Sequence, residues 1–162
     1  MTRRSPTETG WPYSRPSAAD KRNTMITIVL QQEAIDPGRI IRDTGSDADG
    51  ALVSFIGRVR SSSRGNTVLS MEYETYDEMA RKQLQKIAEE ATSRWSLTDC
   101  TVVHRYGRVA IGEASIVIAA SSPHRREAFQ AVQFIIDTVK EKVPIWKKEF
   151  YSDGSSWIDG KK

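Results

Sequence analysis

The spacing of apolar residues along the chain changes several times, which predicts strands mixed with helices. Runs that are rich in β-branched and aromatic residues favour strands. Such runs cover residues 26–30, 51–59, 68–74, 100–106 and 114–120. In the third run Leu69, Met71 and Tyr73 occupy alternate positions, as expected of a strand with one buried face. A turn around Gly112 joins the last two runs.

Two longer segments space their apolar residues with the period of an amphipathic helix. The first is expected over about 76–94, behind a capping box formed by Thr75 and Glu78. The second begins at Ser122-Pro123 and ends before Pro144, because proline disfavours a helical conformation in the residue that precedes it. Its predicted inner face consists of Ala128, Phe129, Val132, Ile135, Ile136 and Val139.

Shorter signals complete the outline of the fold. Asp36 is predicted to cap a short helix that begins at Pro37 and runs through Arg42. The remaining expected features are a bulge or close approach at Gly57, a loop over 61–66, and a terminal hairpin formed by 145–151 and 156–158. Strands and helices mixed in this way, with hairpins as well as crossovers, indicate an α+β fold.

The chain divides into a tail and one domain. Residues 1–24 contain three of the six prolines, many serine and threonine residues, and no periodic apolar pattern. We therefore expect a disordered basic N-terminal tail over 1–24 and a single α+β domain over 25–162. That domain is expected to have a mixed or antiparallel sheet, two long helices and the C-terminal hairpin.

Composition and charge narrow the class of protein. The chain has 162 residues, of which 38% are hydrophobic and 28% charged, as is typical of a globular protein with its own core. No stretch approaches the roughly 20 apolar residues that cross a bilayer. The net charge of +3 belongs to residues 1–24, and residues 25–162 carry 19 charges of each sign. A globally basic, nucleic-acid-binding domain is therefore not indicated.

The sequence lacks the residues that several common kinds of metal site, disulfide and catalytic motif require. The single cysteine, Cys100, excludes an internal disulfide and a CxxC zinc site, so a reducing cytoplasm is the expected location. Cys100 lies in an apolar run, where a buried inert thiol is expected rather than a nucleophile. His104 and His124 are the only histidines, which excludes a multi-histidine metal site. Phosphate-loop, dinucleotide, HExxH and GxSxG motifs are absent from the sequence.

Clustered cations are the remaining candidates for chemistry. His124, Arg125 and Arg126 stand at the start of the second long helix, where free backbone N–H groups already favour an anion. An imidazole and two guanidinium groups added there favour a phosphate site. The alternative interpretation is a solvated first turn. The anion site is the preferred interpretation, because cations beside the positive end of a helix cost energy unless an anion binds.

A second group of cations lies at the other end of the same helix. Lys142 and Lys148 suit ordinary positions at a helix end and on a strand. Lys140 follows the apolar stripe of the helix, and Lys147 alternates with Trp146 in a strand. Either lysine could project into a partly desolvated pocket, where an amine can exchange protons. The pattern alone favours neither this interpretation nor a structural one.

Arg58 and Arg60 form a third, weaker signal, because strand alternation places both on one face.

Helix length separates the first two groups of cations. His124 and Lys140 are 16 positions apart on one helix, which corresponds to ~24 Å. They cannot share one small-molecule site within a single chain. Either there are two sites, or a symmetric dimer brings the start of one helix to the end of its mate, which is our hypothesis.

Three blocks of sequence, 50–60, 121–125 and 140–149, resemble the large, catalytic subunit of molybdopterin synthase. The resemblance implies an α/β hammerhead fold and a homodimer that forms the core of a heterotetramer. It also implies a small ubiquitin-like partner subunit, whose C-terminal Gly-Gly thiocarboxylate enters a pocket of the large subunit. Two sulfurs then pass to cyclic pyranopterin monophosphate and form the dithiolene of molybdopterin. The resemblance implies no cofactor, no metal, no nucleic acid and no membrane partner.

The resemblance also assigns roles to residues. Lys140 and Lys147 match the essential pocket lysines of the family. The substrate-binding and anion-binding positions that it implies are Arg58, Val59, Arg60, His124, Arg125, Lys148 and Glu149. Our hypothesis is that Lys147 and the arginines hold phosphate and pterin, while Lys140 acts at the thiocarboxylate. The tail 1–24 is additional to the family core, and Lys161 or Lys162 could replace a basic C-terminal segment found in other members.

Three alternatives differ in function. A non-catalytic scaffold could bind a Gly-Gly tail, although the presence of both pocket lysines argues against it. A single-stranded nucleic-acid-binding domain could use Arg60, Arg64, Tyr73 and Trp146, but the neutral body disfavours it. A metal-dependent hydrolase is nearly eliminated by the shortage of histidine and cysteine.

Overall fold

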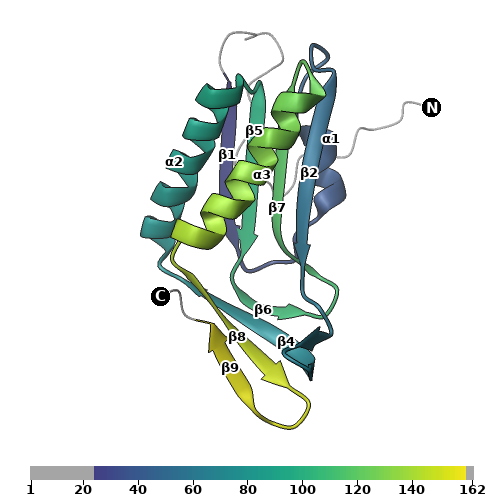
Figure 1. The fold of residues 1–162 in the computed structure, drawn as a ribbon, viewed down its shortest axis with the longest axis vertical. Coiled ribbons are helices and arrows are strands. Elements are labelled where there is room, and N and C mark those ends of the chain that lie inside the picture. Colours follow the sequence, from purple (N-terminus) through teal and green to yellow (C-terminus); the bar gives the residue numbers. More distant parts are fainter. Residues whose placement is uncertain (1–23, 160–162) are drawn as a thin grey trace, which may run out of the picture.

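The computed structural model describes residues 24–159, which form two sheets and three helices (Figure 1). In the large sheet, β1 pairs in parallel with β5, while β5–β7 and β7–β2 pair antiparallel. Its strands, in spatial order, are β1 (Met25–Gln31), β5 (Asp99–Arg105), β7 (Ala114–Ser122) and β2 (Ala51–Arg58). The expected mixed sheet is confirmed.

A second, smaller sheet lies at one end of the large one (Figure 1). Its strands are β3 (Ser62–Ser63), β4 (Asn66–Thr75), β6 (Gly107–Ala110), β8 (Ile145–Tyr151) and β9 (Ser156–Asp159). The long β4 pairs with β8 and also with both β3 and β6. β8 and β9 form the terminal hairpin that the sequence predicts. The four-residue β6 was not predicted, because it is too short to show a period.

The helices cover both faces of the large sheet. They are α1 (Pro37–Asp43), α2 (Asp77–Trp95) and α3 (Arg125–Lys142). α2 and α3 lie side by side on one face, with the main apolar core beneath them, and α1 covers the other face (Figure 1). Asp36 caps α1 as expected, since its carboxylate accepts a hydrogen bond from the backbone N–H of Arg39 at 3.1 Å.

The capping box at Thr75 was wrong. Thr75 is still a residue of β4 and pairs with Ile145, so the N-cap of α2 is Tyr76, which makes no side-chain cap. The Thr75 hydroxyl is buried with no hydrogen-bond partner among the described residues. Sheet pairing therefore takes precedence over the local capping signal, and Asp77 and Glu78 in the first turn complement the helix dipole instead.

Two expected core residues are exposed. Phe129 is 62% exposed, and Ala131 takes its place on the inner face of α3. A helix turns by about 100° per residue, so a position beside a buried Ala128 can already face outward. Leu69 is 57% exposed because the pairing of β4 with β8 shifts register between Val68 and Ser70. That irregularity breaks the alternation on which the sequence prediction depended.

The loop expected over 61–66 contains a tight hairpin. Ser62 and Ser63 pair with Thr67 and Asn66, and the two residues between them both have positive φ. Arg64 has φ 53° and Gly65 has φ 77°, the backbone that a two-residue hairpin requires. The hairpin lays β3 against the edge of the small sheet.

β2 and α3 start together and run in the same direction. Ala51 pairs with Ser122, just before α3 begins, and a Cβ on Gly50 would lie 2.4 Å from the carbonyl oxygen of Pro123. The eight residues of β2 and the 18 residues of α3 both span about 27 Å. Both elements therefore end at the level of the small sheet, β2 at one edge of the large sheet and α3 nearer to α2 (Figure 1).

The predicted tail lies outside the described residues, except for Thr24. The hydroxyl of Thr24 donates a hydrogen bond to the carbonyl oxygen of Leu97 at 3.0 Å. Within residues 24–159, each helix is too short or too polar to cross a bilayer.

The close approach at Gly50 predicts the effect of adding one methyl group. Gly50→Ala should lower the free energy of unfolding by about 2 kcal/mol, because the new Cβ collides with backbone that cannot easily move. Urea denaturation measures this change. Gly38→Ala is the matched control, since only the ends of two side chains lie near its Cβ, and it should be neutral or gain about 0.5 kcal/mol. Equal effects of both substitutions would contradict this interpretation.

Cys100 is predicted to be inert. It is fully buried in the main core, and burial together with the charge of Asp99 raises the pKa of its thiol to about 12. The native protein should therefore not react with a disulfide reagent at pH 8, whereas the guanidinium-unfolded chain should react with one equivalent. Rapid stoichiometric reaction of the native protein would contradict the burial described here.

Candidate functional site

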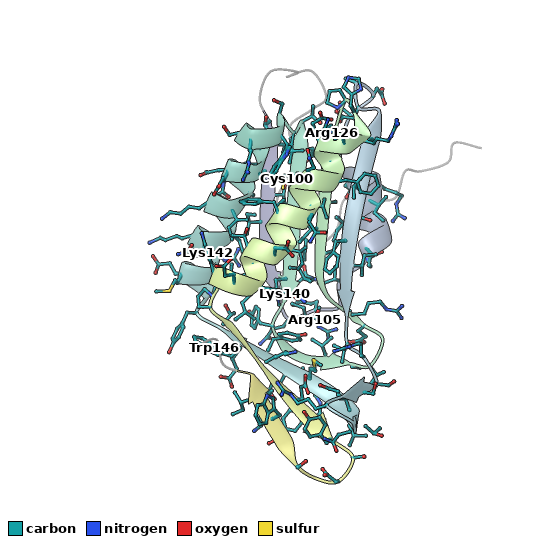
Figure 2. All side chains as sticks on the ribbon, viewed as in Figure 1. Cys100, Arg105, Arg126, Lys140, Lys142 and Trp146 are labelled. Carbon is teal, nitrogen blue, oxygen red and sulfur yellow. The ribbon has the colours of Figure 1, made fainter. Side chains whose placement is uncertain are left out.

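Four of the predicted cations lie at the end of the fold where the large sheet meets the small sheet. Lys140 is exposed in the last turn of α3, and Lys147 is the third residue of β8, which follows directly. β2 ends at Arg58 at the same level of the fold, with Arg60 just beyond it. Figure 2 shows Lys140 and Lys142 at this end of the helix and Arg126 at the other. Positive charge on a neutral body is therefore local here, as an anion site requires.

The end of β2 is fixed by Val59 and not by its arginines. The Val59 side chain is buried, and its backbone N–H and C=O pair with Glu113 and Gly112 at 3.1 and 2.9 Å. The Val59 side chain therefore faces the core, and its backbone hydrogen bonds position the residues on either side. The Arg58 guanidinium donates a hydrogen bond to the carbonyl oxygen of Gly112 at 3.0 Å, and both arginines remain exposed.

A buried carboxylate holds Lys147. The Lys147 ammonium lies 3.4 Å from the Oε1 atom of Glu149, whose side chain is only 2% exposed. The hydroxyl of Tyr151 donates to the other oxygen, Oε2, at 2.7 Å, and Ser63 provides a further hydrogen bond. Burial raises the pKa of Glu149, but Tyr151, Ser63 and Lys147 together outweigh burial and hold that pKa below its ordinary value. Glu149 is therefore an ionised, fully partnered carboxylate.

Lys148 lies on the opposite face of β8. Side chains alternate along a strand, so Lys147, Glu149 and Tyr151 share one face of the small sheet. The Lys148 ammonium instead lies 5.1 Å from the centre of the Phe150 ring, on the other face. The structure does not bring Lys148 together with Lys147.

Lys140 differs from Lys147 in having no carboxylate. Among residues 24–159, its ammonium takes part in no ion pair or hydrogen bond. It stands at the C-terminal end of α3, where the helix dipole favours a cation. Lys147 is thus anchored within the protein, whereas Lys140 is available to a ligand.

His124 and Arg125 lie at the far end of α3. His124 is the N-cap, but its imidazole makes no capping hydrogen bond, and both side chains are exposed. A cavity of about 440 Å³ borders this end, lined among others by Arg94, His124 and Arg126. The 16-residue separation of His124 and Lys140 again corresponds to ~24 Å along the helix. A single chain therefore presents two separate cationic regions.

Sequence reasoning missed Ser63 and Tyr151. Strand alternation could have found Tyr151, because it falls two positions after Glu149 in β8. No sequence signal connects Ser63 with Glu149, since the contact depends on how the β3–β4 hairpin folds.

Other chemistries find no support in the part of the chain that the structure describes. It contains no group of three or more His, Cys, Asp or Glu side chains able to hold a metal ion. Its one cysteine is buried in the core. What the site offers is three exposed cations and a fourth, partly exposed cation that is held by a buried acid.

Comparison with known proteins identifies the family. Residues 30–142 match the family model described as MoaE protein. A molybdopterin synthase catalytic subunit from Pyrococcus abyssi is 38% identical over 135 residues, covering 83% of this chain and 91% of that one. The crystal structure of a molybdopterin synthase from Staphylococcus aureus superposes with a TM-score of 0.75 at 38% identity, covering 83% of this chain and 96% of that one.

A more distant structure shares the fold. It is a complex of subunits 1 and 2 of a molybdopterin-converting factor from Helicobacter pylori, with a TM-score of 0.60 at 20% identity, covering 79% of this chain and 86% of that one. The sequence matches extend over most of the chain and include the ends of β2 and α3. The chain therefore belongs to the MoaE protein family.

Proposed function

We propose that this chain is the catalytic subunit of a molybdopterin synthase and transfers sulfur to cyclic pyranopterin monophosphate, which forms the dithiolene of molybdopterin. The observation that carries the proposal is its identity with relatives named molybdopterin synthase catalytic subunit over 83% of the chain. The position of Lys140, Lys147 and the end of β2 at one end of the fold supports it, because the substrate carries a phosphate.

The sulfur comes from a partner in this proposal. A small ubiquitin-like subunit brings it as a C-terminal Gly-Gly thiocarboxylate, so the catalytic chain needs no nucleophile of its own. The buried Cys100 is consistent with that division. The Helicobacter pylori structure of similar fold is itself a two-subunit complex. The reaction requires no metal or resident cofactor, and we place it in the cytoplasm.

Each cation then has a role. Lys147, held by Glu149, binds an anionic group of the substrate together with Arg58 and Arg60. Lys140 lies at the thiocarboxylate, where its ammonium stabilises developing negative charge and exchanges protons as sulfur adds. The absence of a carboxylate partner among the described residues suits Lys140 to this role.

His124 and Arg125 complete the site from a second copy. One helix cannot present both of its ends to a molecule of this size. In a two-fold dimer, the start of α3 in one subunit reaches the end of α3 in the other, and two composite sites result. With one sulfur carrier on each, the assembly is a heterotetramer.

Lys140→Ala should reduce product formation about 10²–10⁴-fold, because it removes the group that handles charge and protons. The assay reconstitutes the chain with thiocarboxylated partner and cyclic pyranopterin monophosphate. Lys142→Ala is the matched control, since Lys142 is equally exposed in the same helical turn and has no assigned role. Near-normal turnover of Lys140→Ala would show that the catalytic assignment is wrong.

The composite site predicts a dimer in the absence of the partner. Sedimentation velocity at micromolar concentration should give the mass of two chains, because each site needs groups from both. A monomer under these conditions would contradict the shared site, whatever the activity of the chain.

A further inference from the structure

We propose that Tyr151 is a positioning residue of the active site, which fixes the Lys147 ammonium by holding the Glu149 carboxylate between them. The proposal rests on the function proposed above only for what Lys147 binds. The contacts themselves belong to the chain alone. None of the sequence motifs includes Tyr151, and it is buried out of reach of substrate.

The three side chains form a continuous line along one face of β8. Tyr151 donates to Oε2 of Glu149 at 2.7 Å, and the Lys147 ammonium lies 3.4 Å from Oε1. Tyr151 and Glu149 are both buried, at 6% and 2% exposed, whereas the Lys147 side chain is 34% exposed. The line therefore joins two buried side chains to a partly exposed ammonium group.

A buried carboxylate needs every one of these partners. Glu149 is among the largest fully buried side chains, and an unpaired charge at such a position would protonate or move. Tyr151 occupies one oxygen from the core side, so the other oxygen is directed at Lys147. The hydrogen bond from Tyr151 therefore fixes the position of the Glu149 carboxylate, and with it the position of the negative charge that attracts Lys147.

The groups that act on Glu149 and Tyr151 come from β8 and from the β3–β4 hairpin. Lys147 and Tyr151 belong to β8 itself, Ser63 comes from β3, and Arg64 acts on Tyr151 from the adjoining turn. The hydrogen bond to Glu149 is the largest cause that raises the pKa of Tyr151. Tyr151 thus keeps its proton and remains a donor at neutral pH.

Removal of the Tyr151 hydroxyl should change the pKa of Glu149 in one direction. Glu149 loses one of the groups that keep its pKa low, so its pKa rises toward and above the ordinary value. A carboxylate with a raised pKa takes up a proton at a higher pH as acid is added. The attraction that fixes Lys147 is then lost at a higher pH than in the natural chain.

The first measurement follows Glu149 directly. In the dimeric protein without substrate, ¹³C NMR of the Glu149 carboxyl should show its titration moving upward by about one pH unit in Tyr151→Phe. Ser63→Ala should move it in the same direction. Tyr76→Phe is the matched control, because Tyr76 is exposed and makes no hydrogen bond through its hydroxyl within the described residues. An unmoved titration in Tyr151→Phe would overturn the proposal.

The second measurement follows the reaction. In Tyr151→Phe, the acid limb of the profile of kcat/KM against pH should move upward by about one pH unit. The change should come from a higher KM for the pterin substrate, while kcat stays within about twofold of the value for the natural chain. Equal losses at every pH would mean that Tyr151 has only a structural role. If Tyr151→Phe fails to fold, Ser63→Ala is judged by the same two criteria. If the natural chain transfers no sulfur, the NMR titration still decides the positioning role independently.

Discussion

The length of α3 is the constraint on which the rest of the account depends. An 18-residue helix is a rod of about 27 Å, and its two ends carry different cations. The chain cannot bend this rod, because its inner face packs on α2, β2 and β7. Whatever binds near Lys140 therefore cannot touch His124 of the same chain. A second copy, related by a two-fold axis, is the arrangement that we propose to bring both to one substrate.

The small sheet determines how each lysine behaves. Lys147 lies on a strand face that it shares with a buried acid, so its position is set by the protein. Lys140 lies on a helix end and has no such acid among the described residues. Two lysines seven residues apart thus differ in what holds them, although both are simply lysines in the sequence. This difference supports the separate roles that we propose, one in binding and one in charge and proton transfer.

Local pattern predicted the elements well and their contacts less well. The helix α3, which has His124 as its N-cap and Lys140 in its last turn, follows from periodicity, and its end follows from Pro144. Phe129 fits the apolar period of α3 but is exposed, because burial depends on where the sheet lies. The capping signal at Thr75 gave way to strand pairing with Ile145. Val59 matches a family block, yet its side chain serves the core. Non-local packing, which sequence alone does not contain, explains each difference.

Complementation between two inactive variants tests the shared site most directly. His124→Ala and Lys140→Ala chains, each expected to be inactive alone, are mixed and allowed to exchange subunits, and native mass spectrometry verifies that mixed dimers have formed. Each mixed dimer then contains one site with both natural residues, so about a quarter of all sites should regain activity. Mixed dimers with no more activity than the separate variants would contradict the account, because His124 and Lys140 would then not act in one site across two chains.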